Sequence, residues 1–173
     1  QLGENLKDFS TMGFNPYFHS SDLVETELRK SANVMEIASF VEHVFFYGAG
    51  CSSVTLDAII QEGLSRVFTN SNVLVGHDLE ACAFATYYGE PEISCILGTG
   101  SNSCYFDGVE VTEAVPSLAY ILGDEGSGSY FGKRLLQDYF YKLLPEDMAE
   151  AFHFEFNLTD KDIVRKVYNE PNA

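Results

Sequence analysis

The chain is poor in basic residues and contains no tryptophan. Its 173 residues include 10 lysines and arginines against 26 aspartates and glutamates, which gives a formal net charge of −16. A charge of this sign repels the phosphates of nucleic acids and anionic lipid headgroups, so we expect neither kind of partner. ATP is not excluded as a ligand, because backbone N–H groups and a divalent cation can reverse the electrostatic field at one site.

The sequence also lacks the spacing of a metal site and any pattern of a membrane span or secretory signal. Its cysteines, Cys51, Cys82, Cys95 and Cys104, form no C-x-x-C pair and have no histidine pair nearby. This argues against a zinc or iron–sulfur centre. Cys82 and Cys95 lie within apolar runs, where we expect buried free thiols. Without an apolar run of about 18 residues, the chain is expected to be soluble, in a reducing, cytoplasmic setting.

The pattern of apolar residues predicts an α/β protein. Hydrophobic residues make up 46% of the chain, enough for the core of one or two domains. Strands are expected near residues 6–12, 43–47, 72–75, 93–97, 103–106 and 109–112. Helices are expected near residues 21–40, 53–68, 79–88, 126–143, 146–154 and 159–168.

The lengths and the order of the expected strands and helices change near residue 90. Between residues 40 and 90 strands alternate with helices, which favours parallel βαβ units. After Gly89-Glu90-Pro91-Glu92 the strands are short and the turns tight, which favours an antiparallel meander. We therefore expect two domains, covering residues 1–90 and 91–173.

The segment from Ile93 to Phe106 is the most informative part of the chain. An apolar run leads into Gly98-Thr99-Gly100-Ser101-Asn102 and a second run leaves it, which predicts a hairpin. Glycines let the backbone approach a ligand closely, and successive N–H groups at such a tip form a concave anion site. Gly98, Thr99 and Gly100 are therefore candidate phosphate contacts, with an ordinary polar turn as the alternative.

Asp78 lies at the expected carboxyl end of a strand and just before a helix. In open α/β sheets this edge faces the ligand crevice, so the carboxylate could accept a proton as a general base. The alternative is that Asp78 caps the helix beginning at Leu79.

Two further polar positions have both a structural and a functional interpretation. Asp124 and Glu125 precede a helical pattern, where acidic residues favour the positive end of the helix dipole. Asn15 precedes Pro16, and asparagine before proline commonly opens a turn. Either side chain could instead bind the hydroxyl groups of a ligand.

Four of these segments together resemble the BadF/BadG-type ATPase and N-acetylglucosamine kinase family of the actin-like ATPase superfold. They are Met12-Gly13-Phe14-Asn15-Pro16, Val75–Ala81 with Asp78, Gly98–Asn102, and Gly123-Asp124-Glu125-Gly126-Ser127. They follow the order and spacing of the family and span residues 10–135, approximately three quarters of the chain.

The resemblance implies an ATP-dependent sugar kinase with RNase H-like domains, in which Asp78 is the general base. The implied phosphate contacts are Gly98, Thr99 and Gly100. The implied sugar contacts are Asn15, Ser101, Asn102 and Asp124. Mg²⁺ would bridge the phosphates through residues that the sequence does not identify, the substrate would be a sugar or amino sugar, and a homodimer is left open.

The chain departs from the family in two respects. The first phosphate loop should precede Gln1 and the adenine motif should follow Ala173, so the resemblance implies an internal fragment of a protein of about 280 residues. The kinases also carry a Gly-Gly-Trp-Gly-type loop where this chain has Pro116-Ser117-Leu118-Ala119. The sequence therefore does not identify the sugar.

Two other functions remain open at this point. One is an ATPase of the 2-hydroxyacyl-CoA dehydratase-activator type, which binds an iron–sulfur cluster through cysteines at a dimer interface. The other is a non-catalytic regulator that senses a sugar or a nucleotide. The absence of a basic patch argues against a DNA-binding regulator.

Overall fold

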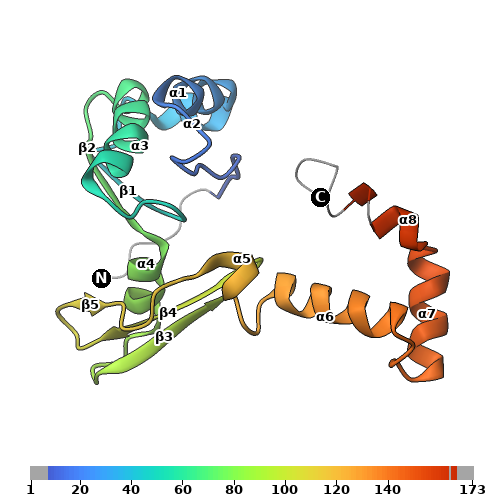
Figure 1. Cartoon of the computed structure of the whole chain (residues 1–173). Helices are drawn as coiled ribbons and strands as arrows, with labels where there is room; N and C mark the ends of the chain where they lie inside the picture. The colour runs from blue at the N-terminus through green and yellow to red at the C-terminus, as the bar shows by residue number, and fades with distance from the viewer. Residues whose placement is uncertain (1–7, 164, 167–173) are drawn as a thin grey trace. The chain divides into compact units, whose positions relative to one another are not determined.

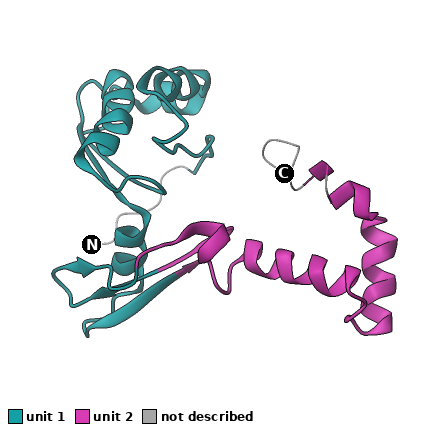
Figure 2. Cartoon of the chain, viewed as in Figure 1, with its two compact units in different colours: residues 1–95, 103–115 teal, residues 96–102, 116–173 magenta. Residues whose placement is uncertain are grey.

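The computed structural model describes residues 8–163, 165 and 166. The chain divides into two compact units, which we describe separately (Figure 2). Unit 1 comprises the residues up to Cys95 together with Ser103–Val115, and unit 2 comprises Ile96–Asn102 and the residues from Pro116 onward. The architecture is mixed α/β, as the sequence predicts. The division into domains at residues 90 and 91 stays a prediction.

Unit 1 contains a parallel βαβ unit (Figure 1). Strand β1 (His43–Gly48) pairs in parallel with β2 (Asn72–His77), in a register that aligns His43 with Asn72 and Gly48 with His77. The crossover between them is α3 (Val54–Val67), which Ser53 caps by accepting a hydrogen bond from the amide of Leu56. The predicted parallel arrangement of residues 40–90 is confirmed.

Of the two helices before β1, the first packs against α3 and the second packs against the first. Helices α1 (Ser21–Lys30) and α2 (Ala32–Ile37) replace the single helix expected over residues 21–40. Ser31 separates them, because it ends α1 in an extended conformation and its hydroxyl then accepts from the amide of Val34 to cap α2. The shared core includes Val24, Leu28, Val34, Ile60, Leu64, Val67 and Val73.

A three-stranded sheet follows α4 (Asp78–Thr86). Its order is β3 (Glu92–Leu97), β4 (Ser101–Phe106) and β5 (Val111–Thr112), with β4 and β5 antiparallel. In unit 1, α4 packs on this sheet: the thiol of Cys104 lies 3.8 Å from the carbonyl oxygen of Leu79, and Thr86 bonds to Ser94 at 2.8 Å. The sheet order agrees with the predicted meander.

Unit 2 is helical apart from the ends of β3 and β4. It contains α5 (Ala119–Leu122), α6 (Gly128–Phe140), α7 (Glu146–Phe156) and α8 (Asp160–Ile163). Tyr139 of α6 packs on Phe152 of α7 at 4.5 Å between ring centroids, and its hydroxyl lies 3.0 Å from Nδ1 of His153. These contacts hold α6 against α7. Among the described residues no helix has the length and apolar composition needed to span a membrane.

Several sequence predictions were wrong in detail. Residues 8–12 form no strand, and residues 6 and 7 lie outside the described residues. The strand expected over residues 109–112 is only Val111–Thr112, because Asp107 folds the preceding turn by accepting from the amides of Val109 and Glu110. The helix expected over residues 159–168 is α-helical over Asp160–Ile163, and residues 164, 167 and 168 lie outside the described part. Helix α5 was not predicted.

Cys95 is also a correction. It was expected to be buried, but it is exposed, whereas its neighbour Ser94 is buried. Side chains alternate along a strand, and the side of β3 that faces α4 carries Ser94. The apolar run therefore predicted the strand correctly, but it did not predict which face of the strand carries Cys95.

The approach of α1 to α3 generates the first prediction, Gly63→Ala. A Cβ at Gly63 would lie 2.6 Å from Cβ of Val24 and 2.8 Å from the carbonyl oxygen of Ser21. Alanine favours a helix over glycine by about 1 kcal/mol, but the clash with backbone should outweigh this gain. We expect the free energy of unfolding, measured by chemical denaturation, to fall by about 1–3 kcal/mol.

Gly132→Ala in α6 is the matched control. A Cβ there would meet no atom within 4 Å, so helix propensity should act alone. The variant should be more stable by about 0.5–1 kcal/mol. Equal effects of the two substitutions would contradict the proposed packing at Gly63.

Candidate functional site

In unit 1, the carboxyl ends of β1 and β2 lie at the same edge because Gly48 aligns with His77. The β1–α3 loop, Ala49–Ser53, leaves this edge, and Asp78 begins α4 directly after β2. Asp78 is about one-third exposed. Its carboxylate is thus held at the start of a helix and remains accessible to a ligand.

Asp78 does not cap α4, contrary to the alternative considered from the sequence. The N-cap is His77, whose imidazole accepts a hydrogen bond from the amide of Leu79 at 3.3 Å. Glu80 completes a capping box by accepting from the amide of His77 at 3.1 Å. The residues around Asp78 therefore perform the capping, and the side chain of Asp78 is left for another role.

Asn15 lies beside the β1–α3 loop. Its side-chain oxygen accepts from the amide of Tyr17 at 3.0 Å, so it opens a turn as its position before Pro16 suggests. The same oxygen lies where a Cβ on Gly50 would clash, and Gly50 has a φ of +85°. Asn15 is thus close to the loop at the strand edge, and its implied role as a sugar contact stays a prediction.

Cys51 of the same loop is close to Asp78. It is 2% exposed, and burial, followed by the nearby negative charges of Asp57 and Asp78, raises the pKa of its thiol to about 11. Asn15 and Asp78 therefore both border the loop that carries Gly50 and Cys51. Apart from the glycine itself, nothing in the sequence points to Gly50 or Cys51 as residues near a site.

In unit 2, the hairpin tip is fastened to the start of α6. The carbonyl oxygen of Gly98 accepts from the amide of Gly128 at 2.8 Å, and that of Thr99 accepts from the amide of Ser129 at 3.1 Å. Ser127 is buried and caps α6 by accepting from the amide of Tyr130. The first amides of α6 are thus bound to the hairpin.

Asp124 fastens the other side of the hairpin. Its carboxylate accepts from the amide of Ser101 at 3.1 Å, and the Ser101 hydroxyl donates to the carbonyl oxygen of Glu125 at 2.9 Å. A Cβ on Gly100 would lie 3.0 Å from both carboxylate oxygens, so a larger residue there would crowd this carboxylate. Asp124 itself has a φ of +60°. The structure brings Gly98, Thr99, Gly100, Ser101 and Asp124 together.

These bonds leave a specific part of the tip for a ligand. The amide of Gly98 donates to the carbonyl oxygen of Gly100 at 2.9 Å, and Ser101 is bound to Asp124. Among the described residues of the tip, the amides of Thr99 and Gly100 make no backbone hydrogen bond. Adjacent amides of this kind fit phosphate oxygens, and the Thr99 hydroxyl could add a third donor. Asn102 lies within β4 and is partly buried.

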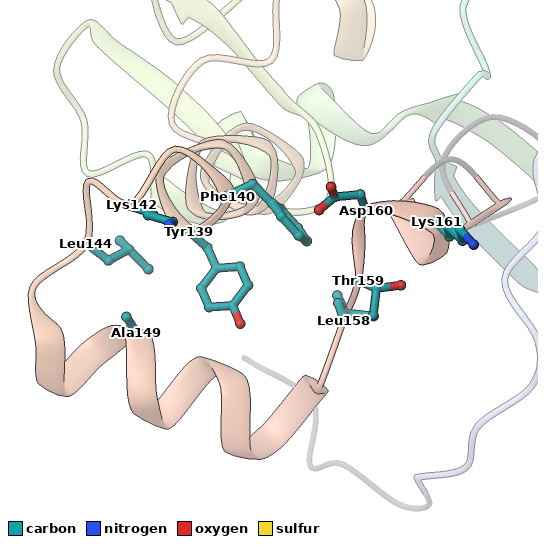
Figure 3. Close-up of a pocket in the computed structure, with 9 residues that line it drawn as sticks. All are labelled: Tyr139, Phe140, Lys142, Leu144, Ala149, Leu158, Thr159, Asp160 and Lys161. Atoms are coloured by element: carbon teal, nitrogen blue, oxygen red, sulfur yellow. The ribbon is translucent and has the colours of Figure 1, made fainter.

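A separate cavity of about 880 Å³ lies among the helices of unit 2 (Figure 3). It is lined by Tyr139, Phe140, Lys142, Leu144, Ala149, Leu158, Thr159, Asp160 and Lys161. None of these is a predicted site residue. Within the described ranges no group of three or more His, Cys, Asp or Glu residues could hold a metal ion.

Comparison with solved structures finds a close relative of this chain. A crystal structure from Porphyromonas gingivalis, named "Putative N-acetylglucosamine Kinase", is 38% identical to it, with a TM-score of 0.86. The match covers 96% of this chain and 60% of the other, so this chain spans three-fifths of the length of that protein. Comparisons with family models and with curated proteins find no match.

The hydrogen bond from the amide of Ser101 to the Asp124 carboxylate generates the second prediction. Asp124→Ala should remove the acceptor of this amide. We therefore expect the hydrogen-exchange protection of the Ser101 amide, measured by NMR, to fall about tenfold or more. Asp124→Asn should keep most of the protection, because asparagine retains an acceptor and tolerates a positive φ. Unchanged protection of the Ser101 amide in Asp124→Ala would contradict this hydrogen bond.

The third prediction concerns Cys51. With a pKa near 11, about one thiol in a thousand is ionised at pH 8, so iodoacetamide should leave Cys51 unmodified there. Exposed Cys95 should be alkylated under the same conditions, as measured by peptide mass spectrometry. Reaction at Cys51 should accelerate as the pH rises toward 11, because the thiolate becomes populated. Alkylation of Cys51 as fast as Cys95 at pH 8 would refute this assignment.

Proposed function

We propose that the full-length protein is an ATP-dependent sugar kinase of the actin-like ATPase superfold, similar to N-acetylglucosamine kinases. The observation that carries the proposal is the 38% identity, over nearly the whole chain, to a protein named as such a kinase. The proposal includes membership of the BadF/BadG-type family, a cytoplasmic location and a sugar or amino sugar as substrate.

The proposed phosphate contacts are supported by the geometry of unit 2. The hairpin is fixed by Asp124 and α6, which leaves the amides of Thr99 and Gly100 without a backbone acceptor among the described residues and so available to a ligand. Preorganised donors of this kind stabilise charge that develops on a transferred phosphoryl group. Mg²⁺ bound to the phosphates would neutralise further charge.

Asp78 supplies the proposed general base. Its carboxylate takes the proton of the acceptor hydroxyl as that oxygen forms a bond to the γ-phosphorus of ATP. The bond from the γ-phosphorus to the β–γ bridging oxygen breaks, and ADP leaves. Support comes from the position of Asp78 at a strand end, partly exposed and not needed as the helix cap. The proposed sugar contacts are Asn15, Ser101, Asn102 and Asp124.

The fourth prediction tests the base with Asp78→Asn in the full-length protein. Turnover with the best sugar should fall by about 10²–10⁴-fold, because a positioned acid–base group contributes this much. Affinity for ATP should change little, since the proposed phosphate contacts are other residues. The assay is sugar-dependent ADP release over a panel of sugars and amino sugars.

Asp147→Asn is the matched control, because Asp147 is an exposed carboxylate in the first turn of α7. It should leave turnover unchanged. Full activity of Asp78→Asn would refute the general-base assignment. ADP release that needs no sugar would favour an ATPase of the dehydratase-activator type instead.

A further inference from the structure

We infer that His77 is a positioning residue for Asp78, which lies against one carboxylate oxygen and bonds to it once that oxygen has taken up a proton. This inference rests on the proposed role of Asp78 as general base. His77 is not a member of the site predicted from the sequence. It is distinguished by three contacts, each of which places its imidazole relative to the carboxylate.

The first contact joins the two side chains directly. Nδ1 of His77 lies 3.1 Å from Oδ1 of Asp78, within hydrogen-bonding distance. The imidazole is 21% exposed and the carboxylate 34%, so the contact is partly shielded from water. Oδ1 is therefore the oxygen of Asp78 that can share a hydrogen bond with His77 when a proton lies between the two atoms.

The other contacts fix the histidine itself. The amide of Leu79 donates to Nδ1, and the amide of His77 donates to the Glu80 carboxylate at 3.1 Å. The Glu80 carboxylate lies over Gly76, where a Cβ would clash with it and with the ring of Tyr47. The imidazole is therefore restrained through both its ring and its backbone.

The chemistry of Nδ1 suits the proton transfer. Because Nδ1 accepts from the amide of Leu79, it has a lone pair, which places the ring hydrogen of neutral His77 on Nε2. When Oδ1 of Asp78 takes the proton of the substrate hydroxyl, the O–H bond of that hydroxyl breaks, and the new carboxyl O–H can turn to donate to the same lone pair. His77 thus provides a partner for Asp78 in the state that forms during the reaction.

A helix cap without influence on the reaction is the competing explanation, and five variants of the full-length protein separate the two. They are His77→Ala, His77→Asn, Asp78→Asn, the double variant His77→Ala with Asp78→Asn, and Ser20→Ala. Asparagine keeps an acceptor near the position of Nδ1 and is a favoured N-cap residue. Ser20→Ala removes the cap of α1, which also accepts at 3.3 Å, and so controls for the loss of a cap alone.

We expect His77→Ala to lower kcat by about 3- to 10-fold, the usual effect of losing a hydrogen bond between neutral groups, with KM for both substrates nearly unchanged. His77→Asn should recover most of the loss, and Ser20→Ala should keep kcat. In the Asp78→Asn background, His77→Ala should change kcat less than twofold, because His77 acts through Asp78.

Three outcomes would overturn the inference while leaving the kinase assignment intact. These are an unchanged kcat in His77→Ala, the same fractional loss in the Asp78→Asn background, and a similar loss in Ser20→Ala. If Asp78→Asn keeps full turnover, the general base and the inference fail together.

If the wild-type protein phosphorylates no sugar, the proposed function fails, and NMR then tests the contact itself. The ¹⁵N chemical shift of Nδ1 in His77 should change in Asp78→Asn and stay constant in Asp147→Asn. An unchanged shift in Asp78→Asn would overturn the inference.

Discussion

The parallel pairing of β1 with β2 is the constraint on which the candidate site of unit 1 depends. Parallel strands require a crossover, and α3 supplies it by burying Ile60, Leu64 and Val67 in the core. The crossover returns the chain so that both strands end at one edge. The β1–α3 loop and the start of α4 then lie next to each other. For this reason the charge of Asp78 adds to the effect of burial and of Asp57 in raising the pKa of the Cys51 thiol. The position of the carboxylate is therefore a result of topology.

In unit 2 the first amides of α6 bind the protein's own hairpin and not an anion. The amides at a helix N-terminus commonly bind anions, and α6 follows a glycine-rich segment that suggests such a site. Instead, the amides of Gly128 and Ser129 bind the carbonyl oxygens of Gly98 and Thr99. The helix thus holds the hairpin, and the amides available for a phosphate are on the hairpin itself. These hydrogen bonds to α6 restrain the backbone of the candidate phosphate contacts.

The sequence predicted the order and type of most elements because apolar periodicity and glycine-rich turns are local signals. It did not predict contacts between distant residues: Asp124 bonds to the amide of Ser101, 23 positions away. It also suggested Asp78 and not His77 as a possible cap of α4, since the two are adjacent at the start of the helix and histidine is not a usual cap. The break at Ser31 was missed because the apolar pattern continues through it, whereas the serine both ends α1 and begins α2.

Units 1 and 2 contain the same local arrangement of a glycine beside a carboxylate, which changes how these glycines are interpreted. In unit 1 the Glu80 carboxylate lies over Gly76 and accepts from the amide of His77, the next residue. In unit 2 the Asp124 carboxylate lies over Gly100 and accepts from the amide of Ser101, again the next residue. At both positions the missing Cβ makes room for a carboxylate of the protein, and bonds to charged acceptors of this kind contribute about 1.5–3 kcal/mol when shielded from water. Gly76 and Gly100 therefore each leave space for a carboxylate of the protein itself, so a glycine in these segments need not indicate close contact with a ligand.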